Sequence, residues 1–423
     1  MKVLVIGSGG REHALAWRLI QSPRVSKVFV APGNAGTARE EGVANLPITA
    51  TDELVKYARE NNIHATVVGP EGPLAAGLVD AFRAAGLRIF GPSKLAAQLE
   101  ASKDFAKRFM ERHEIPTARH ATFTDAKAAH AHVLRHGAPI VIKADGLAAG
   151  KGVVVAETVD EAHKAIDQML EGNQLGGAGH RVVIEEFMVG EEASFIVMVD
   201  GKHVLPLASS QDHKRIFDGD RGPNTGGMGA YSPAPVVTPE VHHRVMTEII
   251  DPVVAGMAAE GIPYTGFLYA GLMIDKQGAP RVVEFNCRLG DPETQPILMR
   301  LKSDFLAIVD HAIDGTLDKA KAEWDRRAAL GVVVAAAGYP GEPRKGDAIE
   351  SLPEDAPDMH VFHAGTAQKD GKVVTSGGRV LCVTALGDKV KMAAERAYQA
   401  VAQVRFEGMQ YRKDIGHRAF NRR

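Results

Sequence analysis

The chain has 423 residues, a length that predicts about three domains and excludes a single small module. Hydrophobic residues make up 45% and charged residues 24% of it, which is typical of soluble globular proteins and excludes disordered and collagen-like chains. The formal net charge of -2 excludes a global basic field, so neither nucleic acid nor a membrane surface is expected as a partner.

The two cysteines, Cys287 and Cys382, are too few and too far apart for a disulfide framework, which favours a reducing compartment. The apolar start of the chain reaches Arg11 and Glu12 before it is long enough for a signal peptide, and no run of about 18 apolar residues is present to span a membrane. These features predict a cytoplasmic protein.

Short β-branched runs and amphipathic helical patterns alternate over the first 91 residues of the chain. The predicted strands span residues 3–6, 28–31, 66–69 and 88–90, and the predicted helices span residues 14–20, 52–60 and 73–85. This alternation is typical of a parallel α/β layer.

A second unit is predicted after a cationic helix at residues 102–112, because Pro116 disfavours helix in the residue before it. The elements expected next are strands at residues 140–144, 153–156 and 181–187 and an Ala-rich helix that ends at residue 170. They indicate a small α+β subdomain.

Two further strands, at residues 193–199 and 204–208, precede a predicted loop at residues 211–235 that is dense in Gly, Pro, Asp and Asn. A loop of this length in a compact domain is usually functional or disordered. The elements expected beyond residue 324 are strands at residues 331–337, 361–365 and 380–384 and a helix at residues 389–404. They predict a third, C-terminal domain.

A glycine-rich turn at residues 7–10 joins the first strand to the first helix, where free backbone N–H groups and the helix dipole favour a phosphate. A dinucleotide fingerprint needs a third glycine where Glu12 stands and an acidic residue roughly 20 positions later, so NAD is disfavoured. A phosphate-bearing small molecule and a purely structural turn are the alternatives. The residues that follow other strands at the same ligand-binding edge are Asn34, Gly36, Pro70 and Glu71.

The glycine-rich segment at residues 145–152 is not a P-loop, because Gly152 follows Lys151 and a strand comes next. A hairpin flap fits it better. Such a flap can close over triphosphate oxygens with backbone N–H groups, while Lys143 on the preceding strand supplies a positive charge. A structural hairpin without a ligand explains the segment equally well.

An acidic and apolar strand at residues 182–188 leads into Glu191 and Glu192. Its backbone groups suit the edge of an adenine, Phe187 suits the face of the ring, and a carboxylate suits the ribose hydroxyls. Adjacent surface glutamates are more often simply solvated, so that alternative stays open.

The sharpest signal is the strand at residues 281–288, in which Glu284, Asn286 and Arg288 alternate with apolar residues. A carboxylate and an amide oxygen on one face suit Mg2+, and an arginine beside them suits a carboxylate or a phosphate. An amphipathic edge strand with a salt bridge explains the alternation equally well. Cys287, on the opposite face, is predicted to lie in the core rather than to act as a nucleophile.

Three further features of the sequence give weaker predictions. Asp291 is predicted as the N-cap of the next helix, with Pro292 as its first residue. Residues 211–215 and 224–229 of the long loop bring together acidic, basic and glycine residues, as a binding loop or as a solvent-exposed one. The histidines at positions 130, 132, 136, 242 and 243 lack a paired ligand set and are assigned to solvent.

Taken together, these motifs closely resemble the glycinamide ribonucleotide synthetase family of ATP-grasp ligases, over residues 1–416. The segments that carry the resemblance are residues 7–13, 31–37, 143–152, 211–214, 224–233, 284–295, 375–381 and 411–416. The resemblance implies an α/β and α+β multidomain chain with an ATP-grasp fold, an amino-terminal Rossmann-like parallel α/β domain and a small C-terminal mixed α/β domain.

The resemblance also divides the chain into domains. The expected domains are an amino-terminal Rossmann-like domain at residues 1–101, a central ATP-grasp domain at residues 102–118 plus 189–325, a flap subdomain at residues 119–188, and a C-terminal domain at residues 326–423.

The family's functional residues carry over to specific positions. The implied ATP-binding residues are Lys103, Lys143, Gly150, Lys151, Gly152, Glu185, Glu186, Phe187, Met188, Glu192 and Lys214. The implied substrate-binding residues are Ser8, Gly9, Gly10, Asn34, Gly36, Pro70, Glu71, Asp212, Arg288, Gly290, Asp291 and Thr294. Glu284 and Asn286 are the implied metal ligands, and Arg288, Asp212 and Lys143 the implied catalytic residues.

The resemblance implies an enzyme that uses ATP to ligate glycine to 5-phosphoribosylamine through glycyl phosphate in purine biosynthesis. It implies Mg2+ or Mn2+ as cofactor, small molecules as the only partners, and a monomer. Residues 269–274 lack the extra carboxylate ligand that many ATP-grasp proteins carry, so a second fully protein-bound metal is not expected. The alternatives are an ATP-grasp ligase for another acid and amine, and a nucleotide-binding sensor without catalysis.

Overall fold

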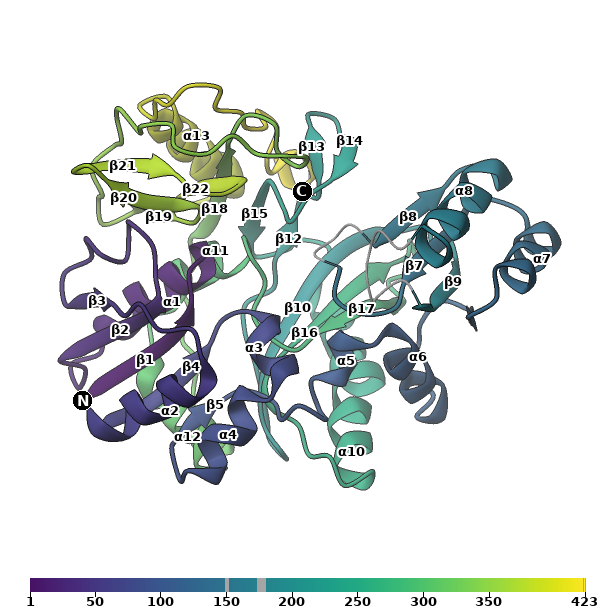
Figure 1. Ribbon diagram of the computed structural model, residues 1–423, viewed down its shortest axis with the longest axis horizontal. Helices are drawn as coiled ribbons and strands as arrows, with labels where there is room; N and C mark the ends of the chain where they lie inside the picture. Colours follow the sequence, from purple (N-terminus) through teal and green to yellow (C-terminus); the bar gives the residue numbers. More distant parts are fainter. Residues whose placement is uncertain (149–151, 173–179, 421, 423) are drawn as a thin grey trace.

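The computed structural model describes residues 1–148, 152–172, 180–420 and 422. The amino-terminal sheet lies at one end of the molecule beside the C-terminal strands, and an arm made of a small sheet and two helices forms the opposite end (Figure 1). A central antiparallel sheet runs between them. No helix in the described part of the chain has the length and apolar character needed to cross a bilayer.

The amino-terminal unit is a parallel five-stranded sheet in the order β3-β2-β1-β4-β5, which confirms the predicted parallel layer. Its strands are β1 (Lys2–Gly7), β2 (Lys27–Pro32), β3 (Val43–Asn45), β4 (Ile63–Val68) and β5 (Ile89–Phe90). Its helices are α1 (Gly10–Ile20), α2 (Thr51–Glu60), α3 (Glu71–Ala76), α4 (Leu78–Ala84) and α5 (Gln98–Ala101). The helix expected at residues 73–85 is two helices, because Gly77 adopts a left-handed conformation with φ 93° and interrupts it.

The arm is a four-stranded sheet in the order β6-β9-β7-β8, covered by two helices whose apolar sides form one cluster with it. Its elements are β6 (His120–Phe123), α7 (Ala126–His136), β7 (Ile140–Ala144), β8 (Val153–Ala156), α8 (Val159–Leu170) and β9 (Val182–Glu186). Helix α6 (Lys103–Arg112) precedes the arm, and the Ser102 hydroxyl caps it by accepting from the Phe105 N–H. The expected α+β subdomain is therefore present.

The central sheet is antiparallel, in the order β11-β10-β16-β17. Its strands are β10 (Glu191–Asp200), β11 (Val204–Pro206), β16 (Thr265–Ile274) and β17 (Pro280–Asn286). Buried residues of this sheet form one hydrophobic cluster. The same hydrophobic cluster includes residues of a continuous helical segment, which consists of α9 (Pro239–Val245), the short π-helix η2 (Met246–Ile250) and α10 (Asp251–Ala259). Helix α12 (Phe305–Ile313) and the 3-10 turn η3 (Leu317–Lys319) follow later in the chain.

The segment expected to be a loop at residues 211–235 contains four short strands, so that prediction was wrong. They are β12 (Gln211–Asp212), β13 (Arg215–Phe217), β14 (Arg221–Asn224) and β15 (Gly229–Ser232). β12 and β15 join the C-terminal sheet in the order β12-β15-β18-β22-β19. Strands this short and rich in glycine carry no alternation of apolar residues that a sequence could reveal.

The other strands of that sheet are β18 (Ala328–Ala335), β19 (Met359–His363) and β22 (Arg379–Gly387). The remaining C-terminal elements are the hairpin β20 (Thr366–Lys369) and β21 (Lys372–Thr375), α13 (Val390–Val401) and α14 (His417–Phe420). β22 is buried along most of its length and lies between β18 and β19, while α13 packs with them in the main apolar cluster.

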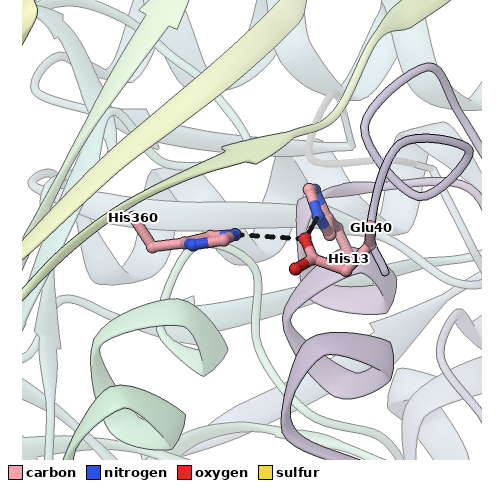
Figure 2. A group of neighbouring side chains, drawn as sticks. All are labelled: His13, Glu40 and His360. Atoms are coloured by element: carbon pink, nitrogen blue, oxygen red, sulfur yellow. Dashed lines mark hydrogen bonds and ion pairs between the residues drawn. The ribbon is translucent and has the colours of Figure 1, made fainter. Parts of the chain in front are cut away.

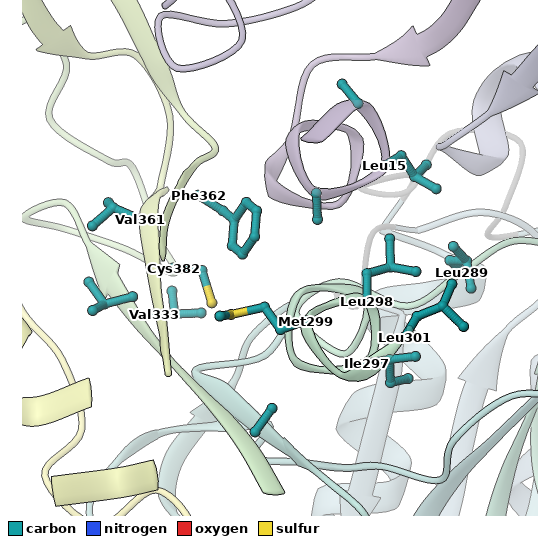
Figure 3. Packing of buried hydrophobic residues seen from close by; sticks show 14 of the residues in the cluster. Leu15, Leu289, Ile297, Leu298, Met299, Leu301, Val333, Val361, Phe362 and Cys382 are labelled. Atoms are coloured by element: carbon teal, nitrogen blue, oxygen red, sulfur yellow. The ribbon is translucent and has the colours of Figure 1, made fainter. Parts of the chain in front are cut away.

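Helix α11 (Thr294–Arg300) is buried at every residue and lies between the amino-terminal and C-terminal units. Figure 3 shows Leu298 on the side of α11 that faces α1, and Met299 on the side that faces Phe362 of β19. The expected N-cap was wrong, because Glu293 is the residue that precedes the helix. The Asp291 carboxylate instead accepts from the Arg11 N–H at 3.3 Å and from Gln295 Nε2 at 2.9 Å.

Candidate functional site

Strand β17 places Glu284 and Asn286 on the same side by ordinary strand alternation, directly after a β-bulge. The pairing register with β16 shifts at Val283, so one extra residue is inserted there. Val282 and Phe285 are both buried although they are three positions apart, while Glu284 and Asn286 are half-buried. The alternation predicted from the sequence is thus present from Glu284 onward, and the bulge determines which face Glu284 occupies.

The Glu284 carboxylate faces a concentration of positive charge. Burial works to raise its pKa, but the ammonium groups of Lys214, Lys143 and Lys103 outweigh burial and hold the pKa below its usual value. Within the described residues, no cation lies within the 4.0 Å of an ion pair from this carboxylate. An ionised carboxylate and an amide oxygen on one face, with no ion-pair partner on the acid, fit a hard divalent cation.

Lys143, on β7, is held by the buried carboxylate of Glu185 on β9. Its Nζ lies 3.1 Å from Glu185 Oε1 and donates to the Val283 carbonyl oxygen at the bulge, also at 3.1 Å. Lys107 Nζ lies 3.2 Å from the other oxygen of Glu185, and burial lowers the pKa of Lys107 to about 8. The Glu185 side chain is therefore occupied by two lysines, while its backbone lies in β9 between β6 and β7.

The start of α6 is tied to the turn after β7 by Asp145. Its Oδ1 accepts from the Lys103 N–H at 2.6 Å, and Arg181 lies 2.7 Å from Oδ2. Lys103 Nζ donates to the Gly146 carbonyl oxygen at 3.1 Å. Strands β7 and β8 form the expected antiparallel hairpin, and Ala144 N–H donates to the Gly152 carbonyl oxygen at 2.8 Å. Two further predicted residues, Gly150 and Lys151, lie outside the described residues.

The end of β9 has the features expected of a segment that contacts a planar ring. The Phe187 side chain is 42% exposed, while Met188 beside it is buried. Glu186 is turned away, because it pairs with Arg281 and with Arg119 at 3.0 Å; these hydrogen bonds outweigh burial and lower its pKa to about 2. Further along, Glu192 Oε2 lies 3.0 Å from the Nζ of a second predicted residue, Lys214.

Arg288 connects the end of β17 to the amino-terminal unit through two acids. Its Nε lies 3.2 Å from Glu71 Oε2 and its NH2 lies 2.9 Å from Glu100 Oε1. Burial raises the pKa of Glu100, although the Arg288 guanidinium opposes this. Sequence reasoning missed Glu100, because nothing in a short alanine-rich helix indicates that its glutamate is buried against an arginine far along the chain.

Asp212 is buried and, within the part of the chain described here, its carboxylate makes no hydrogen bond or ion pair. Burial raises its pKa to about 7, although Lys214 opposes the shift and Glu293 adds to it. Glu293 was also missed by the sequence analysis. Glu293 is buried, and its Oε1 accepts from the Tyr269 hydroxyl at 3.1 Å. The Tyr269 hydroxyl lies 2.7 Å from the Ser194 hydroxyl.

The predicted phosphate turn, with Ser8, Gly9 and Gly10, is partly filled by Glu12. Its Oε2 accepts from the Gly9 N–H at 2.6 Å, and its Oε1 lies 2.6 Å from Arg11 Nε. A Cβ atom placed on Gly69 would lie 1.9 Å from the same Oε1, so the carboxylate is enclosed by backbone. This arrangement explains why a glutamate stands where a dinucleotide fingerprint needs glycine.

Asn34 holds the neighbouring loop together. Its Nδ2 donates to the carbonyl oxygens of Ser8 and His363 at 2.9 and 2.8 Å, and its Oδ1 accepts from the N–H groups of Gly36 and Thr37 at 2.9 and 3.1 Å. All of its amide hydrogen-bonding groups are engaged, so the side chain fixes the loop. A substrate contact at this loop therefore falls to its backbone or to other side chains.

The turn after β17 meets the amino-terminal unit at the same place. Arg11 NH1 donates to the Leu289 carbonyl oxygen at 3.0 Å, and Thr294 Oγ1 donates to the carbonyl oxygen of Gly290. Burial works to raise the pKa of Asp291, but the guanidinium groups of Arg379 and Arg11 lower it. Pro70 directly precedes α3. The hydrogen bonds of Arg11 bring the predicted residues of the turn after β17 to the amino-terminal unit.

A histidine cluster that the sequence analysis did not predict lies between α1 and β19. Figure 2 shows His13, Glu40 and His360 together; His13 Nε2 lies 2.9 Å and His360 Nε2 3.4 Å from Glu40 Oε2. His13 Nδ1 accepts from the His363 N–H at 2.8 Å, so the neutral ring carries its proton on Nε2 and donates it to Glu40. That nitrogen offers no lone pair to a metal, and the cluster is a hydrogen-bonded contact between the two units.

A second cluster, of His213, Asp220 and His417, follows the same logic. His213 Nε2 accepts from the Gly416 N–H at 3.1 Å, so Nδ1 carries the proton toward Asp220. Asp220 is already paired with Arg412 and Arg418 at 2.9 Å each. Neither cluster includes the histidines assigned to solvent from the sequence.

Both cysteines are free and buried, and burial raises the pKa of the Cys287 thiol. This confirms the prediction that Cys287 belongs to the core rather than to a reacting centre, since a reactive cysteine needs a lowered pKa and some exposure.

Comparison with protein families matches the chain to phosphoribosylglycinamide synthetase along nearly all of its length. The N domain matches residues 1–100, the ATP-grasp (A) domain residues 101–294, and the C domain residues 329–418. The phosphoribosylamine--glycine ligase of Ralstonia nicotianae is 65% identical over 422 residues, and that of Neisseria meningitidis serogroup A is 64% identical over 423 residues; each match covers 100% of both chains.

Among solved structures, the phosphoribosylamine--glycine ligase of Thermotoga maritima is 38% identical, with a TM-score of 0.87 over 98% of this chain and 100% of that chain. The biotin carboxylase domain of a Hydrogenobacter thermophilus 2-oxoglutarate carboxylase has a TM-score of 0.74 at 16% identity, over 97% of this chain and 91% of that one. The second likeness concerns the fold alone. These matches confirm the ATP-grasp fold expected from the sequence.

The raised pKa of Asp212 makes stability depend on pH. The folded chain keeps the proton up to about pH 7, whereas the unfolded chain releases it near its ordinary pKa of 3.8, so the contribution of this group to stability is lost as the pH rises through that window. We predict that the stability of Asp212→Asn relative to the parent protein rises from pH 5 to pH 7, by roughly 1 kcal/mol for each pH unit, and levels off above pH 7.

Thermal unfolding of the substrate-free protein at pH 5, 6, 7 and 8 measures this difference. The exposed Asp388→Asn is the matched control and should show no such trend. A stability difference between Asp212→Asn and the parent that stays constant with pH would contradict the prediction.

Proposed function

The chain belongs to the phosphoribosylglycinamide synthetase family, and from this membership we propose that it ligates glycine to 5-phosphoribosylamine in purine biosynthesis, converting ATP to ADP and phosphate. The observation that carries the proposal is the group of cations around Glu284. Lys103, Lys143 and Lys214 surround a carboxylate at the junction of the arm, the central sheet and the amino-terminal unit.

The proposed reaction has two steps. The carboxylate of glycine attacks the γ-phosphorus of ATP, giving glycyl phosphate and ADP. The amine of phosphoribosylamine then attacks the acyl carbon, phosphate leaves, and the amide forms with loss of a proton. The main obstacle is the approach of one anion to another, so catalysis depends on positioning and charge neutralisation rather than on a protein nucleophile.

The nucleotide is proposed to lie between the arm and the central sheet. Its phosphates would contact Lys103, Lys143, Lys214 and the hairpin that includes Gly150, Lys151 and Gly152. The backbone of residues 185–188 and the exposed Phe187 ring suit adenine, and Glu192 suits the ribose hydroxyls. Support for this placement comes from the lysines paired with Glu185 and Glu192 and from the half-exposed aromatic ring at the end of β9.

Glu284 and Asn286 are the proposed ligands of the divalent metal. When bound there, Mg2+ or Mn2+ would neutralise charge on the nucleotide's phosphate oxygens, and oxygen ligands of this kind suit either ion. The ligand pair rests on the regular alternation of β17 from Glu284 to Asn286, which puts both oxygen-bearing side chains on one side of the strand.

The two substrates are proposed to meet around Arg288. Phosphoribosylamine would occupy the junction formed by residues 8–10, the loop held by Asn34 and Gly36, and the Pro70 and Glu71 turn. Glycine would lie near Asp212, Arg288 and the turn at residues 290–294, with the guanidinium binding its carboxylate. A pKa of about 7 suits Asp212 to accept the proton that the amine loses when the amide forms.

The same proposal includes a monomer that works in the cytoplasm. The two buried, unpaired cysteines suit the reducing conditions of the cytoplasm.

The activity is tested by measuring ADP release with MgATP, glycine and phosphoribosylamine generated in situ, omitting each in turn. We expect turnover only when all three are present, and a strong preference for glycine over alanine, serine and aspartate. ADP release with another acid or amine would retain the ATP-grasp chemistry and refute the substrate assignment. Nucleotide binding without turnover would favour the sensor alternative.

Glu284→Gln and Arg288→Ala should each reduce kcat by about 10² to 10³, because each removes a preorganised charge from the reacting centre. The matched controls are Glu248→Gln and Arg244→Ala, which break a half-exposed ion pair on the helical face and should leave kcat unchanged. Circular dichroism confirms that the variants fold. A near-normal kcat at saturating Mg2+ in either site variant would exclude the role proposed for that residue.

A further inference from the structure

Glu100, on α5, contacts three consecutive residues at the end of β17. Its Oε2 accepts from the Cys287 N–H at 2.7 Å, and its Oε1 lies 2.9 Å from Arg288 NH2. With the Asn286 side-chain amide turned so that both its nitrogen and its oxygen find hydrogen-bond partners, the nitrogen lies 3.1 Å from the same Oε1. The Glu100 side chain is only 8% exposed, so these contacts are shielded from water.

These contacts determine which way the Asn286 amide points. Both of its polar atoms are satisfied only when the nitrogen donates to Glu100 Oε1 and to the Phe285 carbonyl oxygen, at 3.1 and 3.3 Å, and the oxygen faces donors. In the opposite orientation the amide oxygen would lie against the Glu100 carboxylate and repel it. A divalent cation binds the oxygen of an amide and not its nitrogen, so the orientation matters for any metal on this face.

We propose that Glu100 is a positioning residue, which presents the Asn286 oxygen to the divalent cation and fixes the Arg288 guanidinium beside it. This inference rests on the proposed function, because it takes Asn286 as a metal ligand. Glu100 touches neither the cation nor a substrate. Replacing a residue that orients a metal ligand in this way typically lowers metal affinity or activity by about 10- to 100-fold.

Neutral side chains of similar shape are poor substitutes for Glu100. Three donors converge on its two oxygens, and a glutamine offers one acceptor oxygen and one donor nitrogen. At least one of the three contacts is then lost. The packing of α5 itself depends instead on its buried Leu99 and on Ala97 before it, so the glutamate is not required to hold the helix in place.

Glu71 provides a matched comparison, because it pairs with Arg288 at 3.2 Å, while among the described residues no hydrogen bond or ion pair joins its carboxylate to Asn286 or to the Cys287 backbone. Loss of the Glu71 carboxylate disturbs only the guanidinium. Loss of the Glu100 carboxylate disturbs the guanidinium and the amide together. The two variants therefore separate an effect on the metal ligand from an effect on the arginine.

The experiment measures Mn2+ affinity of the protein–ADP complex by electron paramagnetic resonance of free Mn2+, without turnover. Glu100→Gln and Glu100→Ala should each weaken Mn2+ binding by about 10-fold or more. Glu71→Gln should change it by less than about 2-fold. Affinity for ADP in EDTA, measured by calorimetry, should be unaltered in all three variants, and unchanged Mn2+ affinity in both Glu100 variants would overturn the proposal.

A rescue distinguishes positioning from general damage to the structure. Asn286→Asp places a second carboxylate against Glu100, so we expect it to weaken Mn2+ binding in the parent protein. In the Glu100→Gln background the same change should restore Mn2+ affinity by about 10-fold, because a carboxylate presents an oxygen in either orientation. A double variant that binds Mn2+ no better than Glu100→Gln would overturn the positioning role.

Asn286→Ala separates a failure of this inference from a failure of the proposed function. If Asn286→Ala weakens Mn2+ binding and the Glu100 variants do not, only the role of Glu100 is refuted. If Asn286→Ala leaves Mn2+ affinity unchanged, the metal-ligand assignment in the proposed function fails, and the inference fails with it.

Discussion

The site depends on the pairing of buried charges, because several cations converge on one carboxylate, Glu284. Three of these cations are each backed by an acid: Lys143 by Glu185, Lys214 by Glu192 and Arg288 by Glu100. Cations crowded together in a partly dehydrated site repel one another, and the acid paired with each of the three offsets this repulsion. The arrangement lets the protein hold positive charge ready for anionic substrates without an excess of buried charge. The acids come from the arm, the central sheet and the amino-terminal unit, so the charge balance also requires all three to be assembled.

The sequence predicted the parts of the molecule that rest on local patterns. The parallel amino-terminal sheet, the arm with its hairpin and the strand that bears Glu284 and Asn286 all follow from short-range periodicity and glycine placement, and the structure confirms them. The ATP-grasp fold and the family were identified from ordered motifs, and the comparisons confirm both. The functional roles of individual site residues and the domain boundaries stay predictions.

Sequence reasoning failed where contacts between distant segments decide the structure. Glu100 and Cys287 are 187 positions apart, and no local signal reveals that the glutamate accepts from that backbone. Asp291 has the right neighbours for an N-cap, yet the Arg11 N–H, 280 positions away, competes for its carboxylate. Residues 211–232 have the composition of a loop, but β12 and β15 complete a sheet whose other strands all begin at residue 328 or later. In each case tertiary contacts outweighed local preference.

In the proposed reaction, the cation-lined site promotes the transfer of phosphate from ATP to the carboxylate of glycine. The most direct test supplies glycine labelled with 18O in its carboxylate, with ATP and phosphoribosylamine, and measures the mass of the released inorganic phosphate. We expect each turnover to transfer one labelled oxygen from glycine to phosphate, because the attacking carboxylate oxygen stays bonded to phosphorus when the amine displaces the phosphate. Formation of the amide with release of unlabelled phosphate would contradict the proposed glycyl phosphate intermediate.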